Sequence, residues 1–470
     1  MDVVAEFSAA IGAEHVLTGA DAVAFGRDWM GQYPTTPRAV LRPGSTAEVS
    51  AVMRIADQHG IRIIPIGGNT GLTGGTSAEG EIMLSLGRMN RIREIRPNVR
   101  TALVDAGVIL ANLHDAAEAH GLIFPLSFGA RGSATVGGAL STNAGGSNVL
   151  RYGSTRALVL GVEVVLADGR VMNLMSELHK DNSGYALKDL FIGAEGTLGI
   201  ITGAVVKLFP KPKAYATALV AMETVDQALL LLNRLNEASG GQVEAFEYMP
   251  DNYMNGLRAR KPELASPFAP DVPVTILTEI GATAPRDATP GPDGETPVTA
   301  MLTEVLAELA EAGQILDATV AGSEAQRRKL WSMRESAAEV VAGHKGKVDN
   351  DICLPLHLIP EFLERAPKRL AEVSPGFELC IVGHLGDGNL HYTVYPGVTD
   401  GSQYEPVRMA IDEIVVDLGG SFSAEHGIGL SKLNSMQRLK DPLALEVMGR
   451  IKAALDPKNL LNPGKVLPKL

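Results

Sequence analysis

PIGGNTGLTGG, at Pro65–Gly75, follows a strand-like run and decides how this chain of 470 residues is interpreted. A second glycine-rich stretch, PLSFGARGSATVGGALSTNAGG, spans Pro125–Gly146, and a third, GAEGTLG, spans Gly193–Gly199. Glycine lets a backbone turn through positive φ and approach a ligand with no Cβ in the way, and Ser, Thr and Asn add donors for anionic oxygens. One such loop is often a plain surface turn. Three in the first half of the chain predict a site that cradles a diphosphate.

These loops are not the common nucleotide fingerprints. The chain has no GxGxxG that opens a helix within a βαβ unit and no GxxxxGK[ST] motif, so the Rossmann and P-loop folds lose their main support. The diphosphate must therefore be held in another way.

The composition narrows the class of protein. With 45% hydrophobic and 20% charged residues, the chain can bury a large core, and its length predicts two domains or more. No apolar run reaches the ~18 residues of a membrane helix, and the N-terminus lacks the pattern of a signal peptide. Two cysteines exclude a disulfide framework and favour a reducing, cytoplasmic location. A net charge of −12 argues against a nucleic-acid partner.

Local patterns predict an α+β binding domain in the first half. Ser45 and Glu48 form a capping box before an apolar stripe at helical spacing, and Gly60 ends the predicted helix. Further elements are predicted as follows: strands at 61–66, 101–106 and 160–166, and a helix at 110–119 that Gly121 stops.

The pattern changes at about Lys211, where longer helices separated by single strands begin. The segment Thr283–Pro297, rich in proline and acids, is predicted to be an exposed loop. The strands expected in this half are 216–221, 272–280, 316–320, 351–354, 378–383 and 390–395.

Several motifs in order resemble one family. They are IGGNTGLTGG, SATVGGALSTNAGGSNVLRYG, FIGAEGTLGIITGAVVKLFPKP, HLGDGNLH, SAEHGIG and DPKNLLNPGKV. Over about Pro37–Pro468 the chain resembles the FAD-dependent D-2-hydroxy-acid dehydrogenases of the vanillyl-alcohol oxidase/p-cresol methylhydroxylase superfamily. The resemblance implies a two-subdomain FAD-binding domain at 1–212, an antiparallel-sheet cap domain with helices at 213–424, and a C-terminal segment, 425–470, that returns to the FAD-binding domain.

The glycine loops are the predicted FAD site. Some members of the superfamily attach FAD through a histidine where this chain has Asn69, and neither of the first two loops holds His or Cys. We therefore expect non-covalent FAD. The predicted cofactor-binding residues are Pro65, Ile66, Gly67, Gly68, Asn69, Thr70, Gly71, Thr73, Gly74, Pro125, Gly132, Ser133, Gly137, Gly138, Ser141, Thr142, Asn143, Gly145, Glu195, Gly196, Ile201 and Asn462.

A second constellation indicates a metal. His384 and His391 bracket LGDGNL, so a strand, a tight Asp-Gly turn and a strand would bring the imidazoles to one end of a hairpin, and Glu425 follows in SAEHGIG. Two imidazoles and a carboxylate with an open position suit a divalent metal such as zinc. Spacing alone leaves open two merely hydrogen-bonded histidines. The resemblance implies that these three residues are the metal ligands.

Three more residues are predicted in the substrate site. His426 would take the hydroxyl proton while the C2 hydrogen leaves as hydride to flavin N5, although it could instead orient Glu425 or contact the isoalloxazine. Arg334 projects from an apolar helix face, and the resemblance implies that it binds the C1 carboxylate; a structural ion pair with a cap-domain acid is the alternative. Asn389 would support the substrate carboxylate or the metal.

The chain departs from the 2-hydroxyglutarate pattern at two positions. Ala338 stands where a threonine is common, and Asp349 stands where a lysine helps to hold the second carboxylate. An acid there would repel that carboxylate unless Lys345 or Lys347 substitutes. The expected substrate is therefore a D-2-hydroxy acid of the 2-hydroxyglutarate or lactate type.

Other functions remain open at this point. They are a metal-free alcohol or sugar oxidase of the same FAD fold, a zinc hydrolase, which lacks HExxH, and a non-catalytic flavin-carrying subunit. Two lone cysteines cannot hold an iron–sulfur cluster, so electrons would pass to an electron-transfer flavoprotein, a quinone or a cytochrome. A homodimer is the expected oligomeric state.

Overall fold

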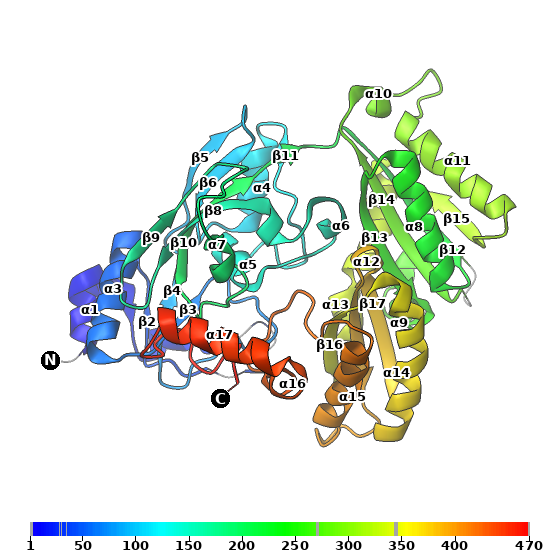
Figure 1. Cartoon of the computed structure of the whole chain (residues 1–470). Helices are drawn as coiled ribbons and strands as arrows, with labels where there is room; N and C mark the ends of the chain where they lie inside the picture. The colour runs from blue at the N-terminus through cyan, green and yellow to red at the C-terminus, as the bar shows by residue number, and fades with distance from the viewer. Residues whose placement is uncertain are drawn as a thin grey trace. The chain divides into compact units, whose positions relative to one another are not determined.

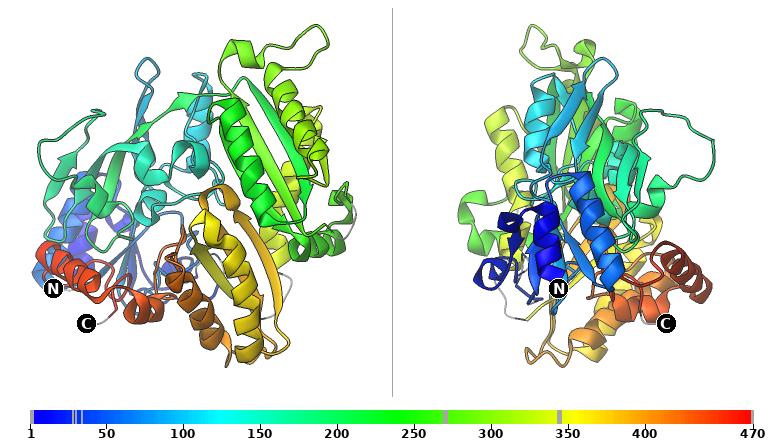
Figure 2. Two further views of the ribbon diagram at one scale, coloured as in Figure 1. Left: turned by 45° about the vertical axis from the view of Figure 1, so that its right-hand side comes forward. Right: turned by 90° about the vertical axis from the view of Figure 1, so that its left-hand side faces the viewer.

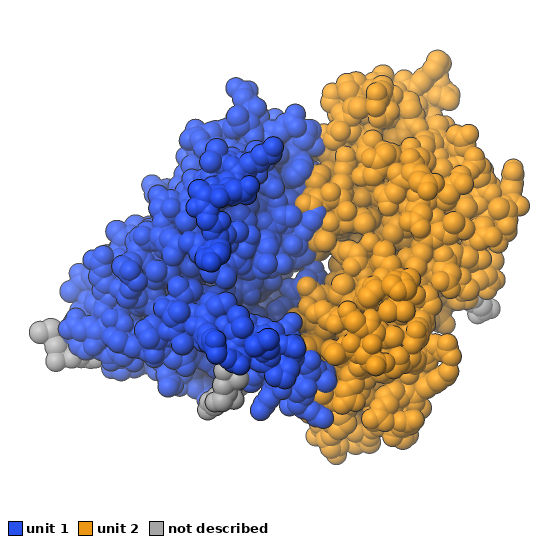
Figure 3. All heavy atoms as spheres, in the orientation of Figure 1, with its two compact units in different colours: residues 1–145, 153–210, 425–470 blue, residues 146–152, 211–424 orange. Residues whose placement is uncertain are grey.

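The computed structural model describes residues 3–27, 29, 31–33, 35–268, 272–342 and 346–468. The chain divides into two compact units, and each is described by itself (Figures 1 and 3). Unit 1 comprises residues 1–145, 153–210 and 425–470, and unit 2 comprises residues 146–152 and 211–424. Both ends of the chain therefore belong to unit 1 (Figure 2).

Unit 1 contains a four-stranded sheet of order β1-β2-β4-β3, an antiparallel five-stranded sheet of order β5-β6-β10-β8-β9, and the pair β11-β7. Its strands are β1 Val16–Leu17, β2 Ala39–Leu41, β3 Ile63–Ile66, β4 Ile82–Ser85, β5 Ile92–Arg96, β6 Thr101–Asp105, β7 Leu122–Ile123, β8 Val159–Val165, β9 Val171–Leu174, β10 Ile200–Lys207 and β11 Phe209–Pro210. Its helices are α1 Val3–Ile11, α2 Ala20–Val23, α3 Thr46–His59, α4 Leu110–Glu118, α5 Val136–Thr142, α7 Lys188–Phe191, α16 Leu433–Leu439 and α17 Pro442–Leu455, with the short 3-10 helices Ala13–His15 and Thr155–Leu158.

Helix α3 shows how sequence sets the local structure in unit 1. The Ser45 hydroxyl accepts from the Glu48 amide at 3.2 Å, and the Glu48 carboxylate accepts from the Gly44 amide at 2.8 Å. The helix ends at Gly60, whose φ of 64° is left-handed and favours glycine. The predicted Ser45 cap and Gly60 stop are thus confirmed, but the capping box is not complete, because the Glu48 carboxylate binds the Gly44 amide and not the Ser45 amide. The helix leads into β3 and the first glycine loop.

Unit 2 is built on an antiparallel seven-stranded sheet of order β15-β12-β14-β13-β17-β18-β16. Its strands are β12 Ala214–Met222, β13 Val243–Pro250, β14 Val274–Ala282, β15 Asp317–Val320, β16 Val348–Cys353, β17 Glu378–His384 and β18 Asn389–Tyr395. Its helices are α6 Val149–Tyr152, α8 Val225–Ser239, α9 Asp251–Arg260, α10 Pro285–Ala288, α11 Pro297–Glu311, α12 Glu324–Glu335, α13 Ala337–Val341, α14 Ile359–Val373 and α15 Tyr404–Asp417, with the 3-10 helices Pro262–Leu264, Leu356–Leu358 and Leu385–Asp387.

Apolar side chains cover both faces of this sheet. Helices α8, α11, α14 and α15 bury their apolar stripes on one face, and α9, α12 and α13 bury theirs on the other. The six strands predicted in this half are all present, whereas β13 was not predicted. The segment predicted as an exposed loop is mostly exposed but includes the short helix α10.

The two units together have the predicted α+β class, with an antiparallel sheet in unit 2. None of the helices in the described ranges has the length and apolar character that crossing a bilayer requires.

Candidate functional site

The first two glycine loops pack backbone against backbone in unit 1. A Cβ on Gly67 would lie 2.4 Å from the Thr135 hydroxyl oxygen, and a Cβ on Gly68 would lie 2.1 Å from the carbonyl oxygen of Ser133. A side chain at Gly68 would collide with backbone, and one at Gly67 would displace the Thr135 hydroxyl, which accepts from the Gly138 amide. The glycines at these two positions are therefore required by the contact between the loops.

The third glycine loop and the C-terminal segment join this assembly. The Glu195 amide donates to the Ser141 carbonyl at 2.8 Å, and a Cβ on Gly196 would lie 2.5 Å from the ring of Pro65. The Asn462 side-chain amide donates to the carbonyls of Gly75 at 3.0 Å and Glu195 at 2.7 Å. Four segments far apart in sequence thus meet in one place.

Backbone strain gathers in the same assembly. Four predicted cofactor-binding residues adopt positive φ although they are not glycine: Asn69 (53°), Asn143 (50°), Glu195 (49°) and Asn462 (42°). Such conformations cost free energy and concentrate at ligand sites. The Oδ1 atom of Asn462 is buried with no hydrogen-bond partner in the described structure. These features fit a cradle for a phosphate-containing cofactor.

The other predicted FAD-binding residues lie on the same loops or on the elements that carry them. Gly71 and Gly132 are open, since a Cβ on either would meet nothing within 4 Å. The Asn69 side chain binds the Arg27 carbonyl and the Thr76 hydroxyl. The remainder are placed as follows: Ile66 ends β3; Thr70, Thr73 and Gly74 follow it; Pro125 follows β7; Gly137, Gly138, Ser141 and Thr142 lie in α5; Gly145 follows α5; and Ile201 lies in β10.

A polar cluster lies on one face of the sheet in unit 2. Strand pairing sets Glu247 opposite His384, His384 opposite Asn389, and Asp351 opposite His391. Directly opposed residues of antiparallel strands share a face. The register therefore brings the two predicted metal-ligating histidines together, with ring centroids 5.4 Å apart.

Glu247 is the centre of this cluster. Its carboxylate binds His384 Nδ1 through Oε1 at 2.9 Å and Arg334 Nε through Oε2 at 2.7 Å. Burial alone raises the pKa of Glu247, but its interactions with His384 and Arg334 outweigh burial, so its pKa lies below the usual range. Glu247 therefore stays ionised between the imidazole and the guanidinium.

Asp351 lies beside His391 but, unlike Glu247 and His384, the two side chains are too far apart for a hydrogen bond at His391 Nδ1. Its Oδ1 lies 3.7 Å from His391 Nδ1 and accepts from the Asn389 side-chain amide at 3.0 Å. Asn389 also donates to the Ile352 carbonyl at 2.9 Å. The predicted residue Asn389 is thus committed to Asp351 and its own sheet.

The hairpin that carries the histidines differs in detail from the predicted tight turn. A 3-10 helix, Leu385–Asp387, and Gly388 connect paired residues His384 and Asn389. Gly388 has φ of 82°, and a Cβ there would lie 2.3 Å from the Leu354 carbonyl. The connection, 385–388, is therefore longer than two residues, and it passes close to the residue that follows β16.

Glu425 and His426 belong to unit 1, at the point where the chain leaves unit 2. The preceding residue, Ala424, donates its amide to the Asp351 carbonyl at 3.1 Å and to Asp351 Oδ2 at 3.2 Å. His426 Nε2 lies 3.8 Å from Glu425 Oε1. Glu425 therefore directly follows Ala424, the residue whose amide is bound by Asp351.

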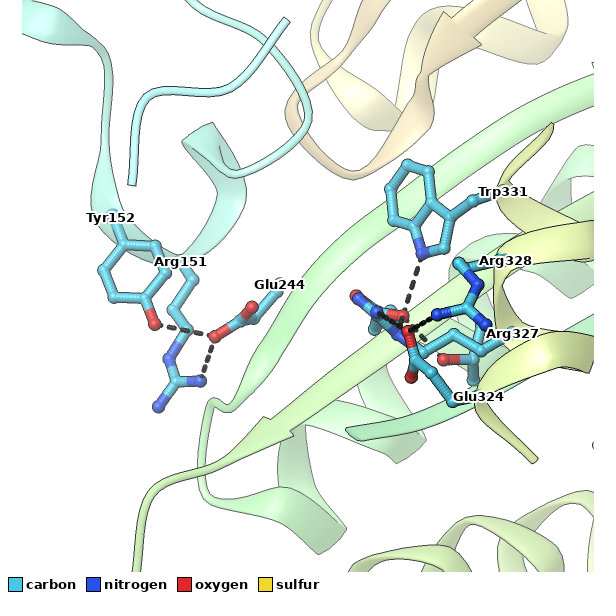
Figure 4. Close-up of polar contacts among 9 residues, drawn as sticks. Arg151, Tyr152, Glu244, Glu324, Arg327, Arg328 and Trp331 are labelled. Carbon is cyan, nitrogen blue, oxygen red and sulfur yellow. Dashed lines mark hydrogen bonds and ion pairs between the residues drawn. The ribbon is translucent and has the colours of Figure 1, made fainter. Parts of the chain in front are cut away.

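Helix α12, which carries Arg334, is fastened to the sheet through Glu279. Figure 4 labels the two residues of the helix that make these contacts, Arg327 and Trp331. Arg327 binds Glu279 with Nε–Oε2 at 2.7 Å and Nη2–Oε1 at 2.6 Å, and Trp331 Nε1 donates to Glu279 Oε2 at 2.8 Å. Arg327, Trp331 and Arg334 follow each other along one side of the helix. The Glu279 contacts therefore fix the helix that positions Arg334 over Glu247.

Figure 4 also shows the second polar contact of β13, which involves Glu244. Arg151 Nη1 and Tyr152 Oη both donate to Glu244 Oε1 at 2.6 Å. Burial raises the pKa of Glu244, and Tyr152 and Arg151 oppose this rise. Residues 146–152 are anchored in this way to unit 2, although they directly follow the second glycine loop.

The positions that depart from the 2-hydroxyglutarate pattern are also defined. Asp349 lies on the same face as Asp351, and Lys347 Nζ lies 2.8 Å from its Oδ2. The Thr393 hydroxyl donates to Asp349 Oδ1 at 3.0 Å. Ala338 lies in α13, and Lys345 lies outside the described residues.

Comparison with known proteins identifies the domain families and the fold of this chain. The family described as FAD binding domain matches residues 37–175, and the family described as FAD linked oxidases, C-terminal domain, matches residues 211–466. The fold is shared with alkyldihydroxyacetonephosphate synthase (TM-score 0.75, 17% identity, covering 98% of this chain and 84% of that one) and with p-cresol methylhydroxylase (TM-score 0.74, 16% identity, covering 98% and 96%).

Relatives in sequence narrow the class. "D-2-hydroxyglutarate dehydrogenase" of Stutzerimonas stutzeri (strain A1501) is 34% identical over 96% of both chains, and its mitochondrial namesake from Danio rerio is 37% identical over 94% of this chain and 80% of its own. The chain belongs to the FAD-dependent D-2-hydroxy-acid dehydrogenases, and it has the fold of p-cresol methylhydroxylase. The predicted family, fold class and FAD cofactor are confirmed.

Sequence reasoning missed Glu247, Asp351 and the pair Arg151–Glu244. Glu247 and Glu244 lie on the unpredicted strand β13, and Asp351 was recognised only as the start of a strand. The one signal available was the presence of two glutamates in VEAFEYMP, a segment buried along its whole length.

Proposed function

We propose that this protein oxidises a D-2-hydroxy acid to the 2-oxo acid, with D-2-hydroxyglutarate as the leading substrate. The names of relatives at 34% and 37% identity support this substrate. The observation that carries the proposal is the buried Glu247 carboxylate, which joins the His384 imidazole to the Arg334 guanidinium. A hydroxy acid requires such a pair of neighbours, one for its hydroxyl and one for its carboxylate.

Arg334 is proposed to bind the C1 carboxylate. Only its Nε atom is hydrogen-bonded among the described residues, to Glu247 at 2.7 Å. The Nη edge of the guanidinium suits a second carboxylate, because the planar fork presents parallel N–H donors. The structural ion pair and substrate binding are therefore compatible, and Glu247 would hold the fork in one orientation.

His384, His391 and Glu425 are proposed as ligands of a divalent metal, zinc in the first instance. Two imidazoles and a carboxylate are a suitable donor set, and the ion would supply a Lewis acid for the substrate hydroxyl. Glu247 on Nδ1 of His384 makes Nε2 the ligand atom of that ring.

His426 is proposed to accept the hydroxyl proton, and Asn389 to orient Asp351. FAD, held by the four segments of unit 1, would accept the hydride from C2. A neutral imidazole is suited to take a proton near pH 7. The Asn389 contacts to Asp351 at 3.0 Å and to the Ile352 carbonyl favour support of the metal site over contact with the substrate.

The distal end of the substrate depends on Asp349. Lys347 at 2.8 Å balances the charge of Asp349, so a second carboxylate would not meet an isolated acid. This pairing favours 2-hydroxyglutarate. The alternative, a smaller acid such as lactate, rests on the loss of the common threonine and lysine at Ala338 and Asp349.

The test is anaerobic bleaching of the flavin absorbance by D- and L-2-hydroxyglutarate, lactate and malate, each with and without a chelator. We expect rapid bleaching by D-2-hydroxyglutarate that the chelator suppresses and zinc restores. Faster bleaching by D-lactate would overturn the substrate. Bleaching that is insensitive to complete removal of bound metal would overturn the metal site, and no bleaching by any acid would move the function to alcohol or sugar oxidation.

The reduced enzyme is proposed to pass its electrons to an external acceptor, which is an electron-transfer flavoprotein, a quinone or a cytochrome. The proposal rests on the count of cysteines, because the two that the chain has, Cys353 and Cys380, are too few to ligate an iron–sulfur cluster. A homodimer and a cytoplasmic location remain proposals from the sequence. Reoxidation rates with each acceptor class, after reduction by substrate, test the first of these points.

A further inference from the structure

The carboxylate of Glu195 binds the backbone that follows His426. The Ile428 amide donates to Glu195 Oε1 at 2.7 Å, and the Gly429 amide donates to Oε2 at 2.9 Å. Each oxygen thus receives one of two successive N–H groups. Burial raises the pKa of Glu195, and the two amide donors oppose this rise. The paired contacts with successive amides fix the peptide by geometry.

The local geometry leaves little room for another arrangement. Gly427 has φ of 80°, and a Cβ there would lie 2.7 Å from Glu195 Oε1. A Cβ on Gly429 would lie 2.3 Å from the Thr73 carbonyl oxygen, which accepts from the Leu430 amide at 2.8 Å. The loop after His426 is therefore held between the first and third glycine loops, all within unit 1.

Glu195 is itself fixed by the FAD-binding assembly. Its amide donates to Ser141 in α5, its carbonyl accepts from Asn462, and its φ of 49° is a conformation that a non-glycine residue adopts only under constraint. The sequence predicted Glu195 only as a cofactor contact. In the structure its side chain instead binds the loop that follows His426.

We propose that Glu195 is a positioning residue for His426: its carboxylate fixes the peptide that follows the imidazole and ties it to the loops that bind FAD. The inference rests on the proposed role of His426 as proton acceptor. Proton transfer requires the base within hydrogen-bond reach of the hydroxyl, and a displacement of about 1 Å costs about 10²-fold in rate. The same contacts link the cofactor cradle to the base that works beside it.

The test is a double-mutant cycle on the rate constant for anaerobic flavin reduction, with wild type, Glu195→Gln, His426→Ala and the double variant. In Glu195→Gln one amide N–H would face the carboxamide NH2, which cannot accept it. We expect about 10²-fold slower reduction in the wild-type background and no further slowing when His426 is already alanine. Equal slowing in both backgrounds, or none in either, would overturn the positioning role.

Two readouts separate this outcome from a general structural effect. The FAD dissociation constant of Glu195→Gln should stay within a few-fold of wild type, and hydrogen exchange at the Ile428 and Gly429 amides should accelerate. Loss of FAD, or unchanged exchange, would contradict the proposal. Asp441→Asn is the matched control, because Asp441 also accepts a backbone N–H, from Ala444 at 2.8 Å, but at the start of α17.

Failure of the proposed function gives a different result. If no 2-hydroxy acid reduces the wild-type flavin, the reaction assignment fails, while the exchange measurement still tests the Glu195 contact. If the wild type is reduced but Glu195→Gln reacts at the same rate, the reaction stands and the positioning role fails.

Discussion

The two units of this dehydrogenase build their sites from different parts of the chain. In unit 1 the proposed FAD site is formed by backbone: glycines let the loops approach each other, and four predicted cofactor-binding residues that are not glycine adopt positive φ. In unit 2 the polar cluster is formed by side chains on one face of a regular sheet. Arg334 and Glu247 are 87 residues apart in sequence, and His384 and Glu247 are 137 apart.

This difference shows which kind of functional site can be recognised from the sequence. A backbone site needs particular residue types at consecutive positions, so it leaves a motif. A sheet-face site needs only that strands meet in the right register, so its members are scattered. The comparison predicts that substitutions in the unit 1 loops impair the protein through steric clashes. Substitutions on the sheet face of unit 2 should impair it through loss of charge complementarity.

Gly68→Ala should have the largest effect. The new Cβ would lie 2.1 Å from the Ser133 carbonyl oxygen, which is backbone and cannot turn aside. We expect loss of bound FAD and a fall of about 3 kcal/mol or more in the free energy of unfolding. The ratio of flavin to protein absorbance and urea unfolding measure the two effects.

The control for this prediction is Gly129→Ala in the second glycine-rich stretch. A Cβ on Gly129 would meet nothing within 4 Å, and its φ does not lie in the left-handed region. FAD content should be unchanged. If Gly68→Ala retains as much flavin as Gly129→Ala, the two loops do not pack as closely as the backbone contact requires.

Arg334→Lys tests the side-chain site and should have an intermediate effect. An ammonium keeps the charge beside Glu247 but cannot present the planar fork to a carboxylate. We expect FAD binding to be retained and kcat/KM for the 2-hydroxy acid to fall by about 10²-fold, or about 2.7 kcal/mol, within the range of charge-assisted pairs. Steady-state kinetics with an artificial electron acceptor provide the measurement.

Arg328→Lys is the matched control on the same helix. The Arg328 side chain is 70% exposed, and its charge partner is Glu324 on the preceding turn. Its replacement should leave kcat/KM unchanged. An equal loss in both variants would show that α12 tolerates no substitution, and that Arg334 has no special relation to the substrate.

The same contrast explains what could be predicted from sequence. The helix from Thr46, its Ser45 cap and the three glycine loops follow from local rules, and so do most strands of unit 2. Strand β13 does not, because Glu244 and Glu247 interrupt the apolar alternation of a fully buried segment. Their partners come from distant elements, so only the folded structure explains why these charges are buried.

Residues 146–152 show a second limit of sequence reasoning. They directly follow the second glycine loop, and the sequence places them in the FAD-binding domain, whereas the structure groups them with unit 2. The reason is the contact of Arg151 and Tyr152 with Glu244. The assignment of this short segment to unit 2 depends on the buried Glu244 carboxylate, and no local sequence pattern predicts it.

Glu163→Gln should have the smallest effect and isolates a carboxylate of unit 1 that only stabilises. Glu163 Oε1 accepts from Thr46 at 2.6 Å, Arg93 at 2.9 Å and Thr202 at 3.0 Å. Burial raises its pKa, but these partners outweigh burial and hold the pKa below its ordinary value of 4.5. Its stabilisation is therefore complete above about pH 4.5 and is lost as the pH falls through the lower native pKa.

The free energies of unfolding of wild type and Glu163→Gln should accordingly differ by about 1.5–3 kcal/mol at neutral pH, as for hydrogen bonds to a charged group. The difference should shrink as the pH falls below 4.5, while the rate of flavin reduction at neutral pH stays the same. Urea unfolding across this pH range gives the first quantity and anaerobic reduction gives the second. A slower reduction would mean that side chains of unit 1 away from the loops also support the reaction, and the division between a backbone site and a side-chain site would then be too sharp.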